Sequence, residues 1–468
     1  MNSDSPEIAD HESFRDSSNL VTDEGKRNFI YPKKPKGRFH NARIIFSIVL
    51  LGIMFGFPLI KISGHPFMLF NVIDRKFIVF GLAFGPHDFY IFGLATIAFI
   101  VFIFLFTAIF GRVFCGWACP QTIFLEMVFR KIEYWIEGDY IRQRQLSKAP
   151  WTGKKILRKF SKYLIFAFLS VLIANTCIAW VVGFDDLIKI ISEPVRMHTA
   201  GFMATVSFSI LFYFIFAWFR EYACIFICPY GRLQGVLLDS NSVVIVYDDI
   251  RGEPRGKLKK GLERELGDCI DCNECVVVCP TGIDIRNGTQ LECVNCTACI
   301  DACDNVMDKI DKPRGLIKFA SSNMIKSRTK FKLTTRVVGY STILIILITV
   351  LTVILLKRQP IDVTILRTPG MMYQEQPGNL ISNLYMVKIN NKTFDPVNIV
   401  LKLENTEGEI KIIGTDINLD ANAVSEAKFL VLIPKDKLTK MNTPLEIGVY
   451  KNKQRFQVYK STFLGPGG

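Results

Sequence analysis

The chain has 468 residues, half of them hydrophobic, and a positive mean hydropathy of +0.27. This composition favours a membrane protein and argues against a small secreted disulfide scaffold. The net charge of +14 would suit a nucleic-acid binder. However, the basic residues cluster beside apolar segments, and no RRM, helix-turn-helix or zinc-finger pattern occurs, so nucleic acid is not an expected partner.

The chain begins with a polar, acidic stretch over residues 1–25, which we expect to be disordered. A segment with seven Lys and Arg residues follows, GKRNFIYPKKPKGRFHNAR. It is not a signal peptide, because the basic region is long and no small-residue cleavage site follows it.

Five apolar segments are long enough to cross a bilayer, which requires about 20 residues. They cover residues 42–60, 89–111, 162–183, 201–219 and 338–356. Lys and Arg counts in the flanking regions alternate as 7, 3, 10, 2 and 18. By the positive-inside rule, the sequence predicts a multi-pass membrane protein with its N-terminus in the cytoplasm and its C-terminus outside the cytoplasmic membrane.

Two stretches between and after the spans have a different character. Residues 65–84 are apolar but interrupted by Asp74, Arg75 and Lys76, so we interpret them as an interfacial or re-entrant loop. Residues 360–468 contain seven short runs rich in Val, Ile, Leu and Tyr, separated by turn residues. These runs predict an all-β, immunoglobulin-like sandwich without a disulfide.

Eight cysteines fall in two runs of one spacing, CxxCxxCxxxC, at 269–279 and 293–303. This is the spacing of bacterial ferredoxins with two [4Fe–4S] clusters, in which the fourth cysteine of each run ligates the other cluster. We therefore predict two four-cysteine sets. The first cysteine set is Cys269, Cys272, Cys275 and Cys303, and the second cysteine set is Cys279, Cys293, Cys296 and Cys299.

Zinc and disulfides are the alternatives for these eight cysteines. Structural zinc sites favour separated CxxC pairs, and disulfides would be reduced in the cytoplasm. Asp304 stands where the second run would usually have proline, but proline is not a ligand. The iron–sulfur interpretation therefore stands, and it predicts a ferredoxin-like α+β domain.

A second cysteine motif, CxxxCP, occurs twice, after the second and the fourth span. Each copy follows a basic residue, Arg112 or Arg220. We infer an internal repeat of two helices plus CxxxCP, with both sulfurs of each motif on one side of a helical turn. The thiol set consists of Cys115, Cys119, Cys224 and Cys228. Two such pairs could bind Cu(I) or exchange electrons as dithiol and disulfide, whereas a single motif would more often serve packing.

The remaining candidates are weaker. Cys177 lies alone within the third span, where packing is the expected role. His65, His87 and His198 fall in loops predicted to face outward, with Met68 and Met197 nearby. A copper port of His and Met is chemically reasonable there, but three interfacial polar residues are the simpler interpretation.

Four stretches together resemble the cytochrome c oxidase accessory protein family CcoG, also called FixG or Rdx. They are the motif R-x2-CGWACPQT, CPYGRLQ, VYDDIRGEPRGK and CPTGIDIRNGTQLECVNCTACIDACD. The resemblance implies a polyferredoxin-like membrane protein that assists assembly of cbb3-type oxidase by reducing Cu(II) to Cu(I). It implies that the eight cluster cysteines are the functional residues of this chain, and it extends this role to the thiol set.

These inferences predict a multi-domain membrane protein. Its expected parts are a basic tail (1–40), a four-helix transmembrane core (41–235), a cytoplasmic ferredoxin-like domain (236–335), a fifth helix (336–358) and a periplasmic sandwich (359–468). The expected partners are the lipid bilayer, a cytoplasmic electron donor and, as the resemblance implies, subunits of a cbb3-type oxidase or copper chaperones. Two rival functions remain, a quinol-linked electron-transfer subunit of a respiratory reductase and a non-catalytic assembly scaffold.

Overall fold

The computed structural model describes residues 27–466 except 74, 258–265, 329, 331–332, 371, 415–417, 422, 439 and 452–453. The predicted disordered stretch 1–25 thus lies outside the described residues. The chain divides into two compact units. We call residues 1–59 and 94–349 the cysteine unit, and residues 60–93 and 350–468 the sandwich unit.

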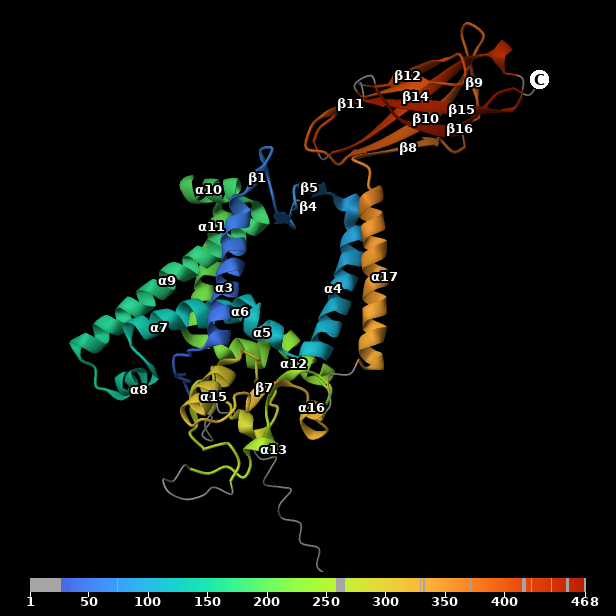
Figure 1. Cartoon of the computed structure of the whole chain (residues 1–468). Helices are drawn as coiled ribbons and strands as arrows, with labels where there is room; N and C mark the ends of the chain where they lie inside the picture. The colour runs from blue at the N-terminus through green and yellow to red at the C-terminus, as the bar shows by residue number, and fades with distance from the viewer. Residues whose placement is uncertain are drawn as a thin grey trace, which may run out of the picture. The chain divides into compact units, whose positions relative to one another are not determined.

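Five helical segments of the described chain are long and apolar enough to cross a membrane, as predicted. They are α3 with η1 (Arg38–Leu59), α4 (Phe89–Phe110), α9 (Gly153–Val182), α11 with η4 (Thr199–Phe219) and α17 (Thr335–Lys357). Helix α9 starts nine residues before the predicted span, because Thr152 caps its N-terminus and its first turns are amphipathic. Helices α9 and α11 pack along each other, and α10 (Phe184–Ser192) connects them (Figure 1).

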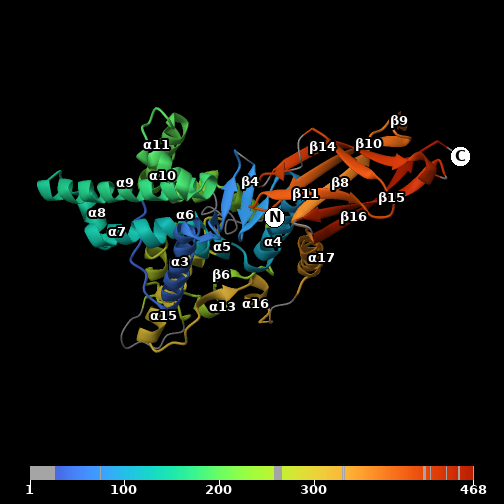
Figure 2. The same cartoon turned by 90° about the horizontal axis from the view of Figure 1, so that it is seen from above.

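Short helices follow the second and the fourth span in the cysteine unit. After α4 come α5 (Val113–Trp117), α6 (Pro120–Ile123), the π-helix η3 (Phe124–Phe129), α7 (Arg130–Ile136) and α8 (Tyr140–Lys148). After the π-helix η4 (Ile215–Phe219) come a further π-helix, η5 (Ala223–Ile227), and α12 (Pro229–Leu237). Helix α7 runs alongside α9 (Figure 2). Single-turn π-helices often occur at functional sites.

The cysteine-rich segment has a small α+β fold. Strands β6 (Val244–Tyr247) and β7 (Ile317–Ala320) form an antiparallel pair. The accompanying helices are α13 (Asp249–Gly252), α14 (Glu274–Val277), η6 (Ile285–Asn287), α15 (Ala298–Lys309) and α16 (Ser322–Lys326). The apolar core beneath the strands includes Ile245, Met307 and Leu316, and several of the cluster cysteines pack against it.

The sandwich unit contains all seven predicted runs as strands in two antiparallel sheets. One sheet consists of β12 (Glu409–Ile413), β14 (Val424–Pro434), β10 (Leu380–Asn391) and β8 (Ile361–Arg367), with β9 (Gln374–Gln376) on β10. The other consists of β13 (Asn418–Leu419), β11 (Val397–Leu403), β15 (Asn442–Lys451) and β16 (Gln454–Leu464). Burial alternates along β8 and β11, and the buried side chains of both sheets form one core.

Residues 60–93 also belong to the sandwich unit and differ from the prediction. Five short strands replace the expected interfacial or re-entrant loop. They are β1 (Lys61–Ile62), β2 (His65–Pro66), β3 (Leu69–Asn71), β4 (Lys76–Val79) and β5 (Leu82–Phe84), and the 3-10 helix η2 (Pro86–Asp88) follows. Of the three charged residues that interrupt the apolar run, Arg75 lies in the turn before β4, where polar residues are favoured, and Lys76 begins β4. Asp74 lies outside the described residues.

Asp88 is fully buried in the sandwich unit between two cations. Its carboxylate lies 2.9 Å from Arg358 Nη2 and 2.8 Å from Lys392 Nζ. Although burial acts to raise the pKa of Asp88, hydrogen bonds from these two cations hold it below its usual value. The folded state is therefore stabilised above the ordinary carboxylate pKa, and this stabilisation is lost as pH falls through the lowered value.

Replacing Asp88 with Asn should destabilise the sandwich unit by about 3–5 kcal/mol, because Arg358 loses its buried counter-ion and Lys392 keeps only the exposed Asp362. Denaturant unfolding of the purified protein in detergent would measure the change. The matched control is Glu426→Gln, which breaks the exposed Lys388–Glu426 pair of the same unit and should leave the midpoint unchanged. Equal midpoints for both variants would contradict a structural role for Asp88.

Candidate functional site

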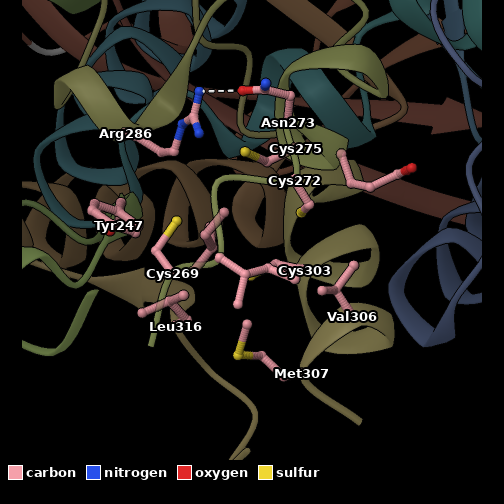
Figure 3. Close-up of a pocket in the computed structure, with 13 residues that line it drawn as sticks. Tyr247, Cys269, Cys272, Asn273, Cys275, Arg286, Cys303, Val306, Met307 and Leu316 are labelled. Carbon is pink, nitrogen blue, oxygen red and sulfur yellow. Dashed lines mark hydrogen bonds between the residues drawn. The ribbon is translucent and has the colours of Figure 1, made fainter. Parts of the chain in front are cut away.

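The first cysteine set lines one pocket of the cysteine unit. Three of its thiols come from the loop before α14 and from α14 itself, and Cys303 comes from α15. Tyr247, Met307 and Leu316 form the apolar wall around them (Figure 3). Of the four, Cys272 is exposed to solvent. This is the combination of three cysteines from the first run and one from the second that the spacing predicts.

The second cysteine set is also brought together, and none of its four cysteines is exposed. Cys293 lies within electrostatic range of Cys279 and Cys296, and Cys299 within range of all three. Burial raises the pKa of Cys293 to about 12 and that of Cys296 to about 11. Without a bound cation these thiols therefore stay protonated at neutral pH, and a metal group would displace their protons.

Both runs follow the same backbone course. Asp271 and Asn273 in the first run have positive φ, and Asn295 and Thr297 occupy the equivalent places in the second run with positive φ too. Left-handed residues between the cysteines curl the chain so that successive thiols can face one centre. Arg286 fixes the first loop by donating hydrogen bonds of 2.6 Å to both Asp271 and Asn273. The four-thiol sets therefore fit the iron–sulfur group that the spacing predicts.

The expected geometry of the CxxxCP motifs is wrong in one respect. Cys115 lies in α5 and Cys224 in η5, but Cys119 and Cys228 have extended backbone and precede the next helices, α6 and α12. Proline disfavours helical backbone at the residue before it, so Pro120 and Pro229 end the first helix and begin the second. The two sulfurs of a motif do not share one helical turn.

The two motifs nevertheless contact each other reciprocally. After the first motif, Gln121 Nε2 donates to the carbonyl oxygen of Arg220 at 3.4 Å. After the second, Gln234 Oε1 accepts from Arg112 Nε at 2.9 Å and from Cys115 Sγ at 3.3 Å. These contacts bring the two halves of the thiol set to the same place in the cysteine unit.

Cys115 and Cys224 each lie within electrostatic range of the other three thiols of the set. Burial raises the pKa of Cys224 to about 12, with smaller contributions from Cys119, Cys115 and Cys228. Burial likewise raises the pKa of Cys115 to about 11, with contributions from Cys119 and Cys228. The thiols of Cys115 and Cys224 are therefore poor nucleophiles in the absence of a metal.

The thiol set directly adjoins the second cysteine set. Cys115 packs in one apolar cluster with Cys296 and Cys299. A Cβ atom on Gly116 would lie 2.4 Å from the carbonyl oxygen of Val294, so only glycine permits this approach. The loop that carries Cys115 and the loop that carries Cys293 and Cys296 are thus in backbone contact.

Replacing Gly116 with Ala should force the two loops apart and cost about 1–3 kcal/mol in stability. We also expect iron to be lost from the second cysteine set first, because its loop must move. Iron content and the thermal midpoint of the purified variant would measure both effects. Gly52→Ala is the matched control, since a Cβ there meets no atom within 4 Å. If Gly116→Ala keeps the iron content and thermal midpoint of the unmodified protein, the two loops do not approach each other as closely as described.

A buried ionic network beside the thiol set was not foreseen from the sequence. Arg220 pairs with Glu133 at 2.8 Å, and Lys162 pairs with Glu137 at 3.0 Å. The network holds four acidic and four basic residues, Glu126, Arg130, Glu133, Glu137, Lys159, Lys162, Arg220 and Glu221. Four of them recur at three- and four-residue intervals between 126 and 137, and this helical periodicity was the available signal.

Arg130 links this network to the second cysteine set. Its side chain is 1% exposed and ion-paired with Glu126 and Glu221. Its Nη2 also donates to the carbonyl oxygen of Pro280 at 3.2 Å, next to Cys279. The guanidinium therefore joins the helical core to the chain segment that carries a predicted cluster ligand.

The weaker candidates do not form a site in the described residues. His65 stacks on Phe394 with ring centroids 4.2 Å apart, and His198 bonds to Glu193 at 2.7 Å. The side chain of His87 is outside the described part. Cys177 packs among the aromatic side chains of α9 and its neighbours, in keeping with a packing role. Among the described residues, no three His, Cys, Asp or Glu side chains converge closely enough for a single metal ion.

Comparisons with known families agree with the cysteine pattern. Residues 219–322 match a 4Fe-4S dicluster domain, and residues 92–143 match a 4Fe-4S binding domain. Residues 351–466 match an IG-like fold at the C-terminal of FixG. Iron–sulfur binding and an immunoglobulin-like C-terminal domain are thus shared features of this chain and these families.

Three curated proteins are similar over long stretches. Protein RdxA of Cereibacter sphaeroides is 33% identical over 90% of this chain and 93% of its own length. Protein RdxB of the same organism is 34% identical over 78% and 80%, respectively. Nitrogen fixation protein FixG of Rhizobium meliloti is 36% identical over 63% of this chain and 58% of its own length.

Proposed function

Since the chain belongs to the FixG/Rdx family of iron–sulfur proteins, we propose that it is a membrane-bound electron carrier that reduces Cu(II) to Cu(I) during assembly of a cbb3-type cytochrome c oxidase. The observation that carries the proposal is the packing of Cys115 against Cys296 and Cys299. It joins the predicted clusters to a third group of soft sulfur ligands. Cu(I) is a soft ion that prefers sulfur ligands. Sulfur ligands at this place therefore stabilise Cu(I) over Cu(II) and favour the reduction of Cu(II).

In this proposal, each four-cysteine set of the ferredoxin-like segment holds one [4Fe–4S] cluster. When bound, each cluster accepts and releases one electron at a time. Cys272 is exposed and marks the face where a cytoplasmic one-electron carrier would dock, whereas Cys296 and Cys299 of the second cysteine set share an apolar cluster with Cys115 of the thiol set. One electron from the reduced carrier passes along this line, and Cu(II) accepts it at the thiol set to become Cu(I).

The proposed orientation follows from the loop charges. It puts the cysteine-rich segment in the cytoplasm and residues 360–468 in the periplasm. A reporter enzyme that is active only after export should therefore be active when fused after Pro466 of the sandwich unit and inactive when fused within the loop 112–152. Activity of the second fusion and silence of the first would reverse the orientation and separate the copper site from its cytoplasmic donor.

Copper loading of the oxidase in cells tests the proposal against the scaffold alternative. In the host that carries this chain, Cys275→Ser should keep the protein in the membrane but lower the copper content of the oxidase as far as deletion of the chain does. Exogenous Cu(I) should restore it in both strains. If the Cys275→Ser strain loads its oxidase normally, the clusters are not needed and the chain acts as a scaffold.

A further inference from the structure

We propose that the cysteine unit binds the phosphate headgroup of an anionic membrane lipid in a basic pocket close to the start of the fifth apolar helix, α17. The basic pocket is lined by Arg251, Lys318, Arg328 and Lys330, together with several apolar residues. None of these residues takes part in the function proposed above. The charge of the pocket, its exposed cations and its place at the ends of two long helices support the assignment.

The basic pocket lies across the β6–β7 pair from the first cysteine set. Tyr247 and Ile317 line the pocket that contains the first cysteine set. Lys318 and Ala320 of β7 line the basic pocket. Because successive side chains of a strand point to opposite faces, the two pockets lie on opposite faces of the pair. The basic pocket has an open volume of about 530 Å³, which lies within the range of about 300–1,000 Å³ for ligand sites.

The lining of the basic pocket has an excess of positive charge. It contains four basic residues and one acidic residue. Lys318 and Arg251 are each paired with a carboxylate, at 2.7 Å and 2.6 Å, respectively. Arg328 and Lys330 are exposed, and neither has an ion pair or a hydrogen bond with another residue of the described chain. Two cations therefore remain for an anion that enters the pocket.

The loop 239–242 joins the basic pocket to the ends of two long apolar helices. Ser242 Oγ donates a hydrogen bond of 2.8 Å to the last turn of α4. Asn323 of α16, a helix that lines the pocket, donates to the same loop at 2.8 Å. Arg336 in the first turn of α17 pairs with Asp239 of the loop at 3.3 Å. Helix α16 accordingly lies close to the start of α17 (Figure 1).

This position favours a membrane lipid as the source of the anion. Because α4 and α17 are long enough to cross a bilayer, their ends lie at its surface. Lys330 is five residues from Thr335, where α17 begins, so it lies at most about 18 Å along the chain from the helix. Ile250 of the pocket is 51% exposed, and Leu333 is 70% exposed. Exposed cations and apolar side chains together suit a headgroup phosphate with its glycerol and upper acyl carbons.

An acidic electron carrier is the alternative occupant of a basic surface. A carrier that reduces the first cysteine set should approach Cys272, which is exposed and lines the pocket on the other face of the β6–β7 pair. The basic pocket faces away from that approach, so a carrier docked there would have the strand pair between itself and Cys272. The geometry therefore favours the lipid over the carrier.

Lipid binding by the full chain tests the proposal. The purified chain, in micelles of a non-ionic detergent, is titrated with phosphatidylglycerol that carries a fluorescent label on its acyl chain. Phosphatidylcholine with the same label is titrated in parallel. We expect saturable binding of phosphatidylglycerol and much weaker binding of phosphatidylcholine, which has no net charge. Inorganic phosphate at the concentration of the lipid should not displace it, because it lacks the apolar part that Ile250 would contact.

The variant Arg328→Gln/Lys330→Gln removes the two exposed cations of the basic pocket. Each basic residue near an anionic lipid surface strengthens binding about fivefold, so the affinity for phosphatidylglycerol should fall about 30-fold. The matched control, Arg144→Gln/Lys148→Gln, removes two exposed charges from α8 of the same unit, close to the start of α9. It should keep the affinity of the unmodified protein. Unchanged iron content and thermal midpoints verify that both variants are folded.

Three results would each overturn the proposal: equal binding of the two lipids, displacement of phosphatidylglycerol by inorganic phosphate, or an unchanged affinity in the pocket variant. If the pocket variant keeps its lipid affinity but its clusters are reduced more slowly by an acidic ferredoxin, the surface belongs to an electron carrier instead. Cu(II) reduction by dithionite-reduced protein in detergent should be the same in both variants. Failure of the lipid site and failure of the proposed function are therefore distinguishable.

Discussion

Replacing Cys115 and Cys224 together with serine should lower the rate of Cu(II) reduction by at least about 100-fold. Serine keeps the size of the side chain but removes the soft sulfur, and one helix-borne ligand is lost from each motif. Cys115 also shares an apolar cluster with Cys296 and Cys299, so the proposed electron path loses its last sulfur group. The purified variant, reduced with dithionite and mixed with Cu(II) and a Cu(I)-specific chelator, gives the rate directly.

Cys177→Ser is the matched control for this experiment and should reduce Cu(II) at the rate of the unmodified protein. The double variant should keep the electron paramagnetic resonance signal of the first and second cysteine sets, because their ligands are untouched. Full reductase activity in the double variant would show that the thiol set is not where the electron leaves. His65, His87 and His198 would then be the next candidates for the copper site.

Replacing Arg130 with Gln should destabilise the cysteine unit by about 3–5 kcal/mol. The side chain is 1% exposed, and its loss removes the buried partner of Glu126 and leaves Glu221 with Arg220 at 3.8 Å. The hydrogen bond from Nη2 to the carbonyl oxygen of Pro280 is lost as well, which loosens the segment around Cys279. We therefore expect iron to leave the second cysteine set before the first. Thermal unfolding and iron content, followed together, measure the two effects.

Arg144 on α8 offers the comparison for Arg130→Gln. It is exposed, so Arg144→Gln removes the same charge without emptying a buried site. That variant should match the unmodified protein in midpoint and in iron content. If Arg130→Gln behaves like Arg144→Gln, the buried network does not support the cluster segment. Arg130→Lys is a further check, because it keeps the charge but cannot reproduce the planar, forked geometry.

Features that depend on local pattern could be predicted from the sequence. Apolar runs with few charges define the five long helices, alternating residues define the seven strands of the sandwich, and the duplicated cysteine spacing defines the two cluster motifs. In each case the physical signal lies within a few tens of residues. The positive φ values of Asp271 and Asn295 repeat because the same spacing imposes the same chain path.

Features that depend on distant partners could not be predicted. Arg130 and Glu221 are 91 residues apart, and nothing in either neighbourhood indicates that they form a buried pair. Asp88 meets Lys392 across 304 residues, and charged residues beside a span are normally solvated. The extended backbone at Cys119 and Cys228 was predictable from the following prolines, but the CxxxC spacing was interpreted as helical instead.

An electron balance on the reduced protein tests the central claim most directly. The purified chain, reduced and then freed of excess reductant without oxygen, is titrated with Cu(II) while cluster absorbance and chelated Cu(I) are recorded. The proposed function predicts that cluster absorbance returns as Cu(I) appears, with one Cu(I) formed for each electron that leaves the clusters. If the clusters stay reduced in excess Cu(II) but are promptly oxidised by a soluble quinone, the chain is a quinone-linked carrier and copper is not its substrate.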